Sequence, residues 1–368
     1  MNKRIVVKIG SSSLTNATGS LSLEKLHDHT KAIARLRRLG HQVILISSGA
    51  VAAGYSKLGY PTRPVTIQGK QAAAAIGQVE LMRYYSKAFQ DESIHVGQLL
   101  LTRENFTKQK QYQNAHNTLE ELLKRGVLPI INENDSVSID ELTFGDNDML
   151  SALVSGLVHA RMTILLTDVN GIYDQPPHLS PDAKKYHYLP AVSDELLLSA
   201  GQSQSAVGTG GMRSKIEAAK TAIAFGSQVF IGTGTGAEKL TDILKGKGDG
   251  TYIGFSGHPQ ATTKEQWIAV HSLPKGTLHI DHGAAEAILS RGKSLLTAGI
   301  CKIDGVFHPG DVVEVREIKG RLIARGMVSM SSDVIADNAN LQEQRRPTSM
   351  AIHRDNLVTI KKGEIIHE

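Results

Sequence analysis

Short apolar segments alternate with longer amphipathic segments from the start of the chain to about residue 258. The short segments are rich in Val, Ile and Leu, and they predict β-strands at 4–9, 42–47, 94–101, 127–132, 162–167 and 228–232. The longer segments carry apolar residues at helical spacing, and they predict helices over 22–40, 70–90, 113–125, 148–159 and 213–225. This alternation predicts an α/β fold.

The predicted strands are almost continuously apolar, which is typical of parallel strands that are buried on both faces. We therefore expect a three-layer sandwich with a mainly parallel central sheet. Ligands of such sheets bind beyond the carboxyl ends of the strands. The polar residues at these ends lie at 8–12, 47–49, 132–135 and 167–168. They predict one shared site at that edge.

The pattern changes after about residue 258, where a linker-like segment precedes short strands, glycine turns and one helix at 284–292. This part predicts a small, β-rich, barrel-like domain. We expect the following organisation: main domain 1–258, linker 259–273, second domain 274–358 and tail 359–368.

The composition is that of an ordinary soluble globular protein, with 40% hydrophobic and 21% charged residues among 368. The first apolar run is short and contains Lys8, so it predicts a strand rather than a signal peptide, and no run approaches membrane-spanning length. The one cysteine, Cys301, excludes an internal disulfide and fits a reducing cytoplasm. Its apolar neighbours predict a core position.

The net charge of +5 suits an anionic substrate, and it would also suit a nucleic acid. Its distribution separates the two. From Ser272 onward there are 13 Lys and Arg against 12 Asp and Glu, so the C-terminal part is close to neutral. This balance does not favour RNA binding by that part.

The segment GTGGMRSK at 208–215 predicts an anion site, because three glycines lead into a helix that carries Lys215 in its first turn. Glycine lets the backbone approach a ligand closely, and a helix start offers free N–H groups. The segment is not a Walker-type loop, since Ser214 precedes the lysine. A nucleotide would therefore be bound on another scaffold.

Lys8 lies in an otherwise apolar strand, where burial is costly unless its ammonium reaches a charged site. The alternative is an exposed strand end. Together, Lys8 and Lys215 could neutralise a phosphoryl group during transfer. Asp148 and Asp168 are candidates to lie between the lysines or to face a magnesium ion.

Ser48 and the following glycine could bind a substrate carboxylate, or they could simply cap a helix. Asp135 and Asn147 could accept hydrogen bonds from a substrate ammonium group, or they could stabilise turns. The 15 histidines form no H-E-x-x-H motif, and we predict no metal-binding residues.

Several motifs together resemble the amino acid kinase family, and they occur in that family's order. They are VVKIGSS at 6–12, LISSGAVAAG at 45–54, KQAAAAIGQ at 70–78, INENDSV at 131–137, FGDNDMLSALV at 144–154, LLTDVNGIY at 165–173 and GTGGMRSK at 208–215. The segments at 276–296 and 308–315 resemble a PUA domain.

The resemblance implies ATP-dependent phosphorylation of the side-chain carboxylate of L-glutamate, the first step towards proline. It assigns catalysis to Lys8, Lys215 and Asp148. It assigns substrate binding to Ser48, Asp135, Asn147, Asn132 and Asn134. It assigns ATP binding to Lys8, Gly10, Thr167, Asp168, Thr209, Gly210, Gly211, Met212, Arg213, Ser214 and Lys215.

The resemblance also implies Mg2+ bound to the ATP phosphates, feedback inhibition by proline, a homodimer or homotetramer, and transfer of the product to glutamyl phosphate reductase. It implies a cytoplasmic protein without a membrane partner. Two alternatives remain at this stage: an RNA-binding or RNA-modifying protein that uses the PUA domain, and a related kinase that acts on aspartate, acetylglutamate or UMP.

Overall fold

A computed structural model describes most of the chain and divides it into two compact units. The described residues are 3–137, 147–175, 177, 180, 182–200, 211–254, 268, 272, 274–340, 349–361 and 364–365. Two predicted nucleotide-binding residues, Thr209 and Gly210, lie outside them. Unit 1 comprises Met1–Asn105 and Gln113–His258, and unit 2 comprises Phe106–Tyr112 and Pro259–Glu368. The limits of the functional domains stay a prediction.

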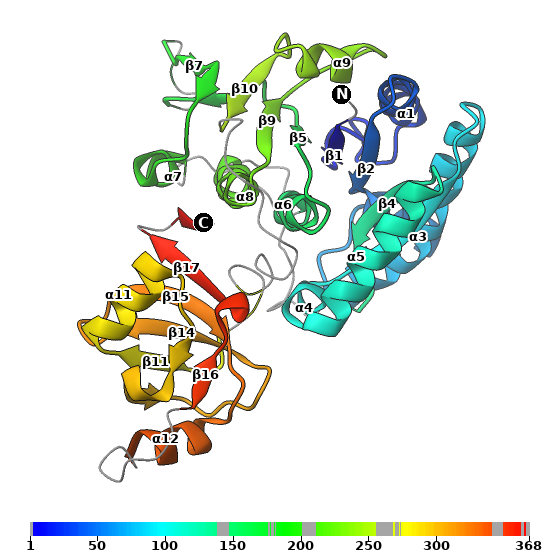
Figure 1. Ribbon diagram of the computed structural model, residues 1–368. Helices are drawn as coiled ribbons and strands as arrows, with labels where there is room; N and C mark the ends of the chain where they lie inside the picture. Colours follow the sequence, from blue (N-terminus) through cyan, green and yellow to red (C-terminus); the bar gives the residue numbers. More distant parts are fainter. Residues whose placement is uncertain are drawn as a thin grey trace. The chain divides into compact units, whose positions relative to one another are not determined.

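Unit 1 contains an eight-stranded sheet of order β3-β4-β2-β1-β5-β9-β10-β8 (Figure 1). The strands are β1 (Arg4–Ile9), β2 (Gln42–Ser47), β3 (Val96–Leu101), β4 (Leu128–Glu133), β5 (Met162–Leu166), β8 (Tyr188–Leu189), β9 (Gln228–Gly232) and β10 (Gly250–Ile253). Within this described sheet, β9 and β10 form the one antiparallel pair of neighbours. The predicted mainly parallel sheet is therefore confirmed. A small antiparallel pair joins β6 (Ile172–Tyr173) to β7 (Lys185–Tyr186).

Among the described residues, the helices between these strands include the five predicted ones, whose limits agree to within a few residues, and five further short helices that the pattern did not predict. They are α1 (Leu23–Arg38), α2 (Ala50–Gly54), η1 (Tyr55–Leu58), α3 (Ile67–Gln90), α4 (Arg103–Thr107), α5 (Gln109–Lys124), α6 (Asn147–Leu157), α7 (Asp194–Ala200), α8 (Met212–Ala224) and α9 (Lys239–Leu244). Helix α3 begins before the predicted start because the Thr66 side chain accepts a hydrogen bond from Gly69 N. Every helix in the described part of the chain is too short or too polar to cross a bilayer.

Alternate residues of the central strands face two separate cores. Ile5, Val7 and Ile9 of β1 pack in one core with apolar residues of α1, α3 and α9. The second core joins residues of α6 and α8 to Leu165 of β5. Because side chains of a strand alternate between faces, the even-numbered positions of β1, including Lys8, belong to the face of α6 and α8. Figure 1 shows α6 and α8 side by side.

Helices α2 and α3 pack backbone against backbone. A methyl group built on Gly77 would overlap the carbonyl of Ala50, and one on Gly54 would overlap the carbonyl of Ala73. Glycine at these two positions therefore lets the helices approach more closely than any other residue would allow. Gly54 of the motif at 45–54 and Gly77 of the motif at 70–78 therefore have a packing role.

Unit 2 is β-rich, as predicted, and has its own hydrophobic core around Leu278, Val313 and Phe307. Its larger sheet has the order β13-β11-β14-β15-β17-β18, and β12 pairs with β16. The elements are β11 (Thr277–Ile280), α11 (His282–Arg291), β12 (Leu295–Leu296), η4 (Thr297–Gly299), β13 (Ile300–Asp304), β14 (Val312–Glu317), β15 (Leu322–Met327), α12 (Ser332–Asn340), β16 (Met350–Ile352), η6 (Arg354–Asn356), β17 (Leu357–Lys361) and β18 (Glu364–Ile365).

The predicted core position of Cys301 is wrong, since this thiol is exposed. Cys301 follows the buried Ile300 on β13, which lies at the edge of the larger sheet. Consecutive residues of a strand point to opposite faces, so the residue after Ile300 turns away from the core. Apolar neighbours alone do not show which face of the strand a residue lies on.

Candidate active site at the carboxyl ends of the strands

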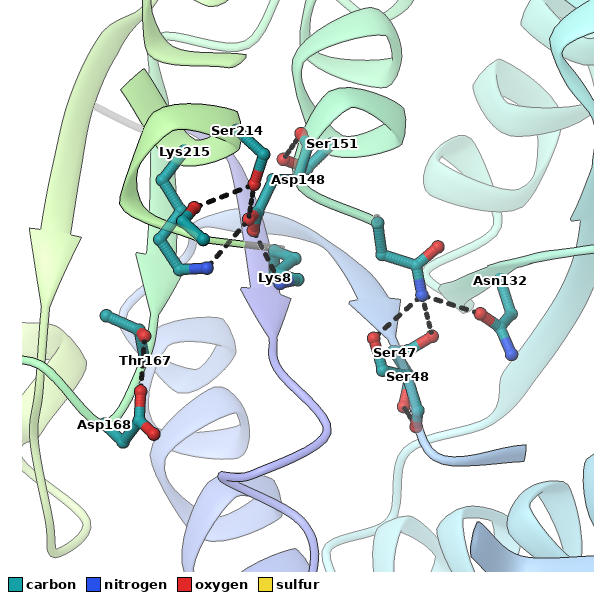
Figure 2. A network of polar contacts seen from close by, with 12 residues as sticks. Lys8, Ser47, Ser48, Asn132, Asp148, Ser151, Thr167, Asp168, Ser214 and Lys215 are labelled. Carbon is teal, nitrogen blue, oxygen red and sulfur yellow. Dashed lines mark hydrogen bonds and ion pairs between the residues drawn. The ribbon is translucent and has the colours of Figure 1, made fainter. Parts of the chain in front are cut away.

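A buried carboxylate lies between two lysine ammonium groups (Figure 2). Asp148 Oδ1 is 2.5 Å from Lys8 Nζ, and Asp148 Oδ2 is 3.0 Å from Lys215 Nζ. The exposed fractions of Lys8, Asp148 and Lys215 are 3%, 0% and 7%. Lys8 is thus not an exposed strand-end residue, which was the alternative left open by the sequence. We call these three residues the lysine–aspartate cluster.

The fold assembles the lysine–aspartate cluster from three separate elements. Lys8 pairs in register with Leu165 of β5, and Leu165 belongs to the core covered by α6 and α8. Asp148 and Lys215 lie in the first turns of α6 and α8. The C-terminal ends of the two helices pack closely, since a methyl group on Gly156 would lie 2.7 Å from the Phe225 ring. Their starts meet at the end of β1, because Asp148 binds both Lys215 and Lys8.

The charges of the cluster favour an anionic ligand. Two ammonium groups lie against one carboxylate in a buried place. Ammonium groups are hydrogen-bond donors only, so a ligand that they contact would have to supply acceptors. A phosphoryl group has the required charge and acceptor oxygens.

The start of α8 supports the cluster through Ser214 and contributes less through the two residues before it. Ser214 Oγ lies 2.9 Å from Gly211 O and 3.4 Å from Asp148 Oδ2. Met212 packs against the core beside α8, and Arg213 binds Glu217 at 2.9 Å. The structure therefore brings Ser214, but not Met212 or Arg213, to the lysine–aspartate cluster.

Three predicted nucleotide-binding residues lie at the ends of β1 and β5. Thr167 Oγ1 donates to Asp168 Oδ1 at 3.0 Å, and Thr167 N donates to Gly232 O at 3.0 Å. Asp168 is exposed, whereas Thr167 is buried. A methyl group on Gly10 would stand 3.6 Å from Lys8 Nζ, so glycine leaves the space beside this ammonium open. In the view of Figure 2, the cluster lies between the Thr167–Asp168 pair and a second polar group around Ser48 and Asn132.

The second polar group is a network of amides and hydroxyls centred on Asn147, the first residue of α6. Asn147 Nδ2 donates to Ser47 O at 3.0 Å, to Ser48 Oγ at 2.8 Å and to Asn132 Oδ1 at 2.9 Å. Asn132 Nδ2 in turn donates to Gln78 Oε1 of α3 at 2.9 Å. All five residues are buried. We call them the amide network.

The geometry around Ser48 excludes a helix-capping role for its side chain. Helix α2 begins after Gly49, and no side chain caps it. Gly49 has a φ of 100°, a left-handed conformation that favours glycine. Ser48 instead accepts a hydrogen bond from Asn147. Its hydroxyl therefore belongs to the amide network rather than to a helix cap.

Hydrogen-bond acceptors remain available near the amide network. The Asn147 Oδ1 atom is buried and has no hydrogen-bond partner among the described residues. Burial raises the pKa of the Asp135 carboxyl to about 6, and the positive charge of Arg63 opposes part of this shift. Asn134 Oδ1 accepts from Ser136 Oγ at 2.6 Å, so it is engaged within its own turn. Asn147 Oδ1 and the Asp135 carboxylate are the groups that suit a ligand ammonium.

Sequence reasoning missed the supporting residues on α3. Gln78 holds Asn132, and the Tyr85 hydroxyl lies 2.9 Å from Ser47 Oγ. Gln78 and Tyr85 are seven residues apart, which places them on one face of the helix. Gln78 is the last residue of the motif KQAAAAIGQ, and the sequence predicted no function for it. A glutamine at the end of an alanine-rich helical segment was the signal that could have identified it.

The acidic residues of the site differ in how well they fit a metal ion. The described residues contain no group of three or more His, Cys, Asp or Glu that could hold a metal ion. Both oxygens of Asp148 lie against lysine ammonium groups, so this carboxylate does not fit as a magnesium ligand. The exposed Asp168 does fit, since carboxylate oxygens are the ligands that magnesium prefers.

Comparison with family models matches the chain to two families. Residues 3–233 match the amino acid kinase family, and residues 276–342 match the PUA domain. The first matched region contains the lysine–aspartate cluster, and the second contains most of the core of unit 2.

Curated relatives match over nearly the whole chain. A protein named glutamate 5-kinase from Bacillus cereus (strain G9842) is 55% identical over 364 residues, which is 97% of this chain and 99% of the relative. One of the same name from Bacillus anthracis is 54% identical over 363 residues, again 97% and 99%. Another from Halalkalibacterium halodurans is 54% identical over 366 residues, 98% of each chain.

A solved structure supports the fold of unit 1. Carbamate kinase from Giardia lamblia bound to AMP-PNP matches with a TM-score of 0.51 and 17% identity, over 68% of this chain and 98% of that chain. At this identity the match concerns the fold alone.

Proposed function

We propose that this chain, which belongs to the amino acid kinase family, transfers the γ-phosphoryl group of ATP to the side-chain carboxylate of L-glutamate. The observation that carries the proposal is the lysine–aspartate cluster, because two buried ammonium groups held side by side suit a phosphoryl group in transfer. The relatives named glutamate 5-kinase support the choice of acceptor.

In the proposed reaction, a carboxylate oxygen of glutamate forms a bond to the γ-phosphorus, and the bond from that phosphorus to the bridging oxygen of ADP breaks. The products are ADP and L-glutamyl 5-phosphate. A carboxylate is already a nucleophile, so the reaction requires no strong general base. Positioning of the two substrates and charge neutralisation then carry the rate.

The cluster residues have distinct parts in this mechanism. Lys8 and Lys215 stabilise the charge on the transferring phosphoryl oxygens, and Asp148 holds the two ammonium groups apart at fixed positions. ATP is bound beside β5, at Thr167 and Asp168, and at the start of α8.

The amide network forms the glutamate side of the site in this proposal. Sheet order supports it, because β2 and β4 lie on one side of β1 and β5 lies on the other. Asn147 Oδ1 and Asp135 accept hydrogen bonds from the substrate ammonium group, and the Ser48 hydroxyl contributes to binding of its α-carboxylate.

The exposed Asp168 carboxylate is the described acidic group of the site that would hold magnesium bound to ATP. The ion would neutralise part of the charge on the ATP phosphates.

The proposal is tested by trapping the acyl phosphate with hydroxylamine. The assay uses the full chain, ATP and magnesium with L-glutamate, L-aspartate or N-acetyl-L-glutamate, and ADP release is followed with UMP. We expect hydroxamate with L-glutamate and only background with the other acids and with UMP. Hydroxamate from another acid in the absence of any from glutamate would assign the protein to a different substrate.

Three further properties extend the proposal on the strength of family resemblance. The reaction is the first step of proline formation, proline inhibits at a place that overlaps the glutamate site, and the chains form dimers or tetramers. An acyl phosphate hydrolyses readily, which favours its direct transfer to a reductase. Proline added to the hydroxamate assay should raise the KM for glutamate. Light scattering measures the mass of the oligomer and hence the number of chains in it.

A further inference from the structure

One member of the amide network, Gln78, is poorly explained by fold stability. Its side chain is buried, with an exposed fraction of 9%, and its Oε1 atom accepts from Asn132 Nδ2 at 2.9 Å. Its Nε2 atom is also buried and has no hydrogen-bond partner among the described residues. An apolar side chain of the same length would remove this unsatisfied donor, but it would leave the buried Asn132 Nδ2 without its acceptor, so the two costs roughly offset each other.

The hydrogen bonds of the network fix the orientation of each amide in turn. Asn132 directs Nδ2 to Gln78, so its Oδ1 faces the opposite way and accepts from Asn147 Nδ2 and from Glu133 N, both at 2.9 Å. An amide presents its oxygen and its nitrogen on opposite sides. Asn147 Nδ2 is therefore committed to the network, and Asn147 Oδ1 is the atom left to meet a ligand.

From this chain of contacts we infer that Gln78 is a positioning residue for the substrate ammonium group. Through Asn132 it holds the Asn147 amide with Oδ1 towards the substrate. The opposite orientation would set the Asn147 NH2 against the ammonium, donor against donor. The inference rests on the proposed function and extends it: Gln78 selects acids that carry a free α-ammonium over acids of the same shape that lack it.

Glutarate is the probe for this selection, because it has both carboxylates of glutamate and no ammonium group. The variant Gln78→Met has a similar length and removes the acceptor, whereas Gln78→Glu keeps an acceptor oxygen. Gln90→Met is the matched control, since Gln90 is exposed at the end of the same helix. For each variant we would measure kcat, the KM values for glutamate and ATP, the inhibition constant of glutarate, and Tm.

We expect Gln78→Met to raise the KM for glutamate about tenfold, the effect of one hydrogen bond, with little change in kcat or in the KM for ATP. The inhibition constant of glutarate should stay within about twofold, because glutarate makes no use of Asn147 Oδ1. Tm should change little, because the variant loses the unsatisfied Gln78 Nε2 and leaves Asn132 Nδ2 unsatisfied in its place. Gln78→Glu should recover most of the glutamate affinity, and Gln90→Met should behave as the parent.

Two results would overturn the inference. An unchanged KM for glutamate in Gln78→Met would show that the relay does not act on the substrate. A lower Tm, a failure to fold, or a parallel loss of affinity for glutamate, glutarate and ATP would show a structural role alone. Failure of the proposed function is distinguishable, because the parent protein would then give no hydroxamate with glutamate.

Discussion

At the scale of single residues, the environment of a side chain decides its chemistry more than its type does. Lys8 and Lys220 are both lysines of unit 1, but Lys8 is buried against Asp148, whereas Lys220 is exposed and pairs with Asp194 at 2.8 Å. An exposed ion pair is screened by water and contributes little, about 0–1 kcal/mol. A buried ion pair is screened much less, so its charges interact more strongly with a ligand bound beside it.

Replacing either cluster lysine by methionine should lower kcat far more than it changes the KM for glutamate. The lysine charges act mainly on the transition state, and loss of one such electrostatic group costs about 10²–10³-fold in kcat. Steady-state kinetics of Lys8→Met and Lys215→Met measure this, with Lys220→Met on α8 as the exposed control. A change confined to KM would remove both lysines from the catalytic step.

The glutamate affinity should depend on pH through Asp135. Burial raises the pKa of this carboxyl to about 6, so it gains a proton as the pH falls from about 7 to about 5.5 and loses its negative charge. The KM for glutamate should therefore rise over this range. In Asp135→Asn the KM should be higher at neutral pH, and this pH step should be absent. An identical pH profile in the variant would assign the titration to another group.

The same shift makes a prediction about stability. The pKa of Asp135 is higher in the folded protein than its ordinary value of 3.8, so the ionised form is the one that the fold disfavours. Asp135 therefore destabilises the fold least at low pH, where it is protonated in both the folded and the unfolded states. The free energy of unfolding falls as the pH rises from about 4 to above 6. Asp135→Asn should raise Tm at neutral pH while it weakens glutamate binding. A lower Tm at neutral pH would contradict this cause of the shift.

At the scale of elements, the site exists because the starts of two helices meet the end of one strand. Strand β1 lies between β2 and β5, so its carboxyl end is the middle of the site. Helices α6 and α8 supply Asp148 and Lys215 from their first turns. Helix α3 contributes no predicted ligand, but it supports β2 through Tyr85 and β4 through Gln78.

The close contact of α2 and α3 should be sensitive to a single methyl group. In Gly77→Ala the added Cβ would overlap the carbonyl of Ala50, and the helices would have to move apart. Overpacking of this kind costs about 1–3 kcal/mol, so we expect a lower Tm. Because α2 follows Ser48 and Gly49, the KM for glutamate should also rise. Thermal unfolding and kinetics measure the two effects.

Ala75→Ser is the control for this prediction, since Ala75 is exposed on the same helix and the change also adds one atom. The control should keep the Tm and KM of the parent. Equal Tm values for Gly77→Ala and the parent would mean that the helices can separate without cost.

At the scale of the whole molecule, each unit folds around its own hydrophobic core. The lysine–aspartate cluster and the amide network lie entirely in unit 1. The near balance of 13 basic and 12 acidic residues from Ser272 onward does not favour RNA binding by the C-terminal part, and this stays a prediction. The relatives named glutamate 5-kinase match 97–98% of the chain, so they share both regions.

The sequence by itself predicted the alternating elements and the mainly parallel sheet, because apolar periodicity and strand-end polar residues are local properties of the chain. It grouped Lys8 and Lys215 with either Asp148 or Asp168, and the family resemblance chose Asp148. Only the tertiary structure decided the exposure of Cys301 and the relay from Gln78 through Asn132 to Asn147. Gln78 and Asn132 are 54 residues apart, and Asn132 and Asn147 are 15 apart. Contacts over such separations depend on strand order and helix packing, which no local pattern specifies.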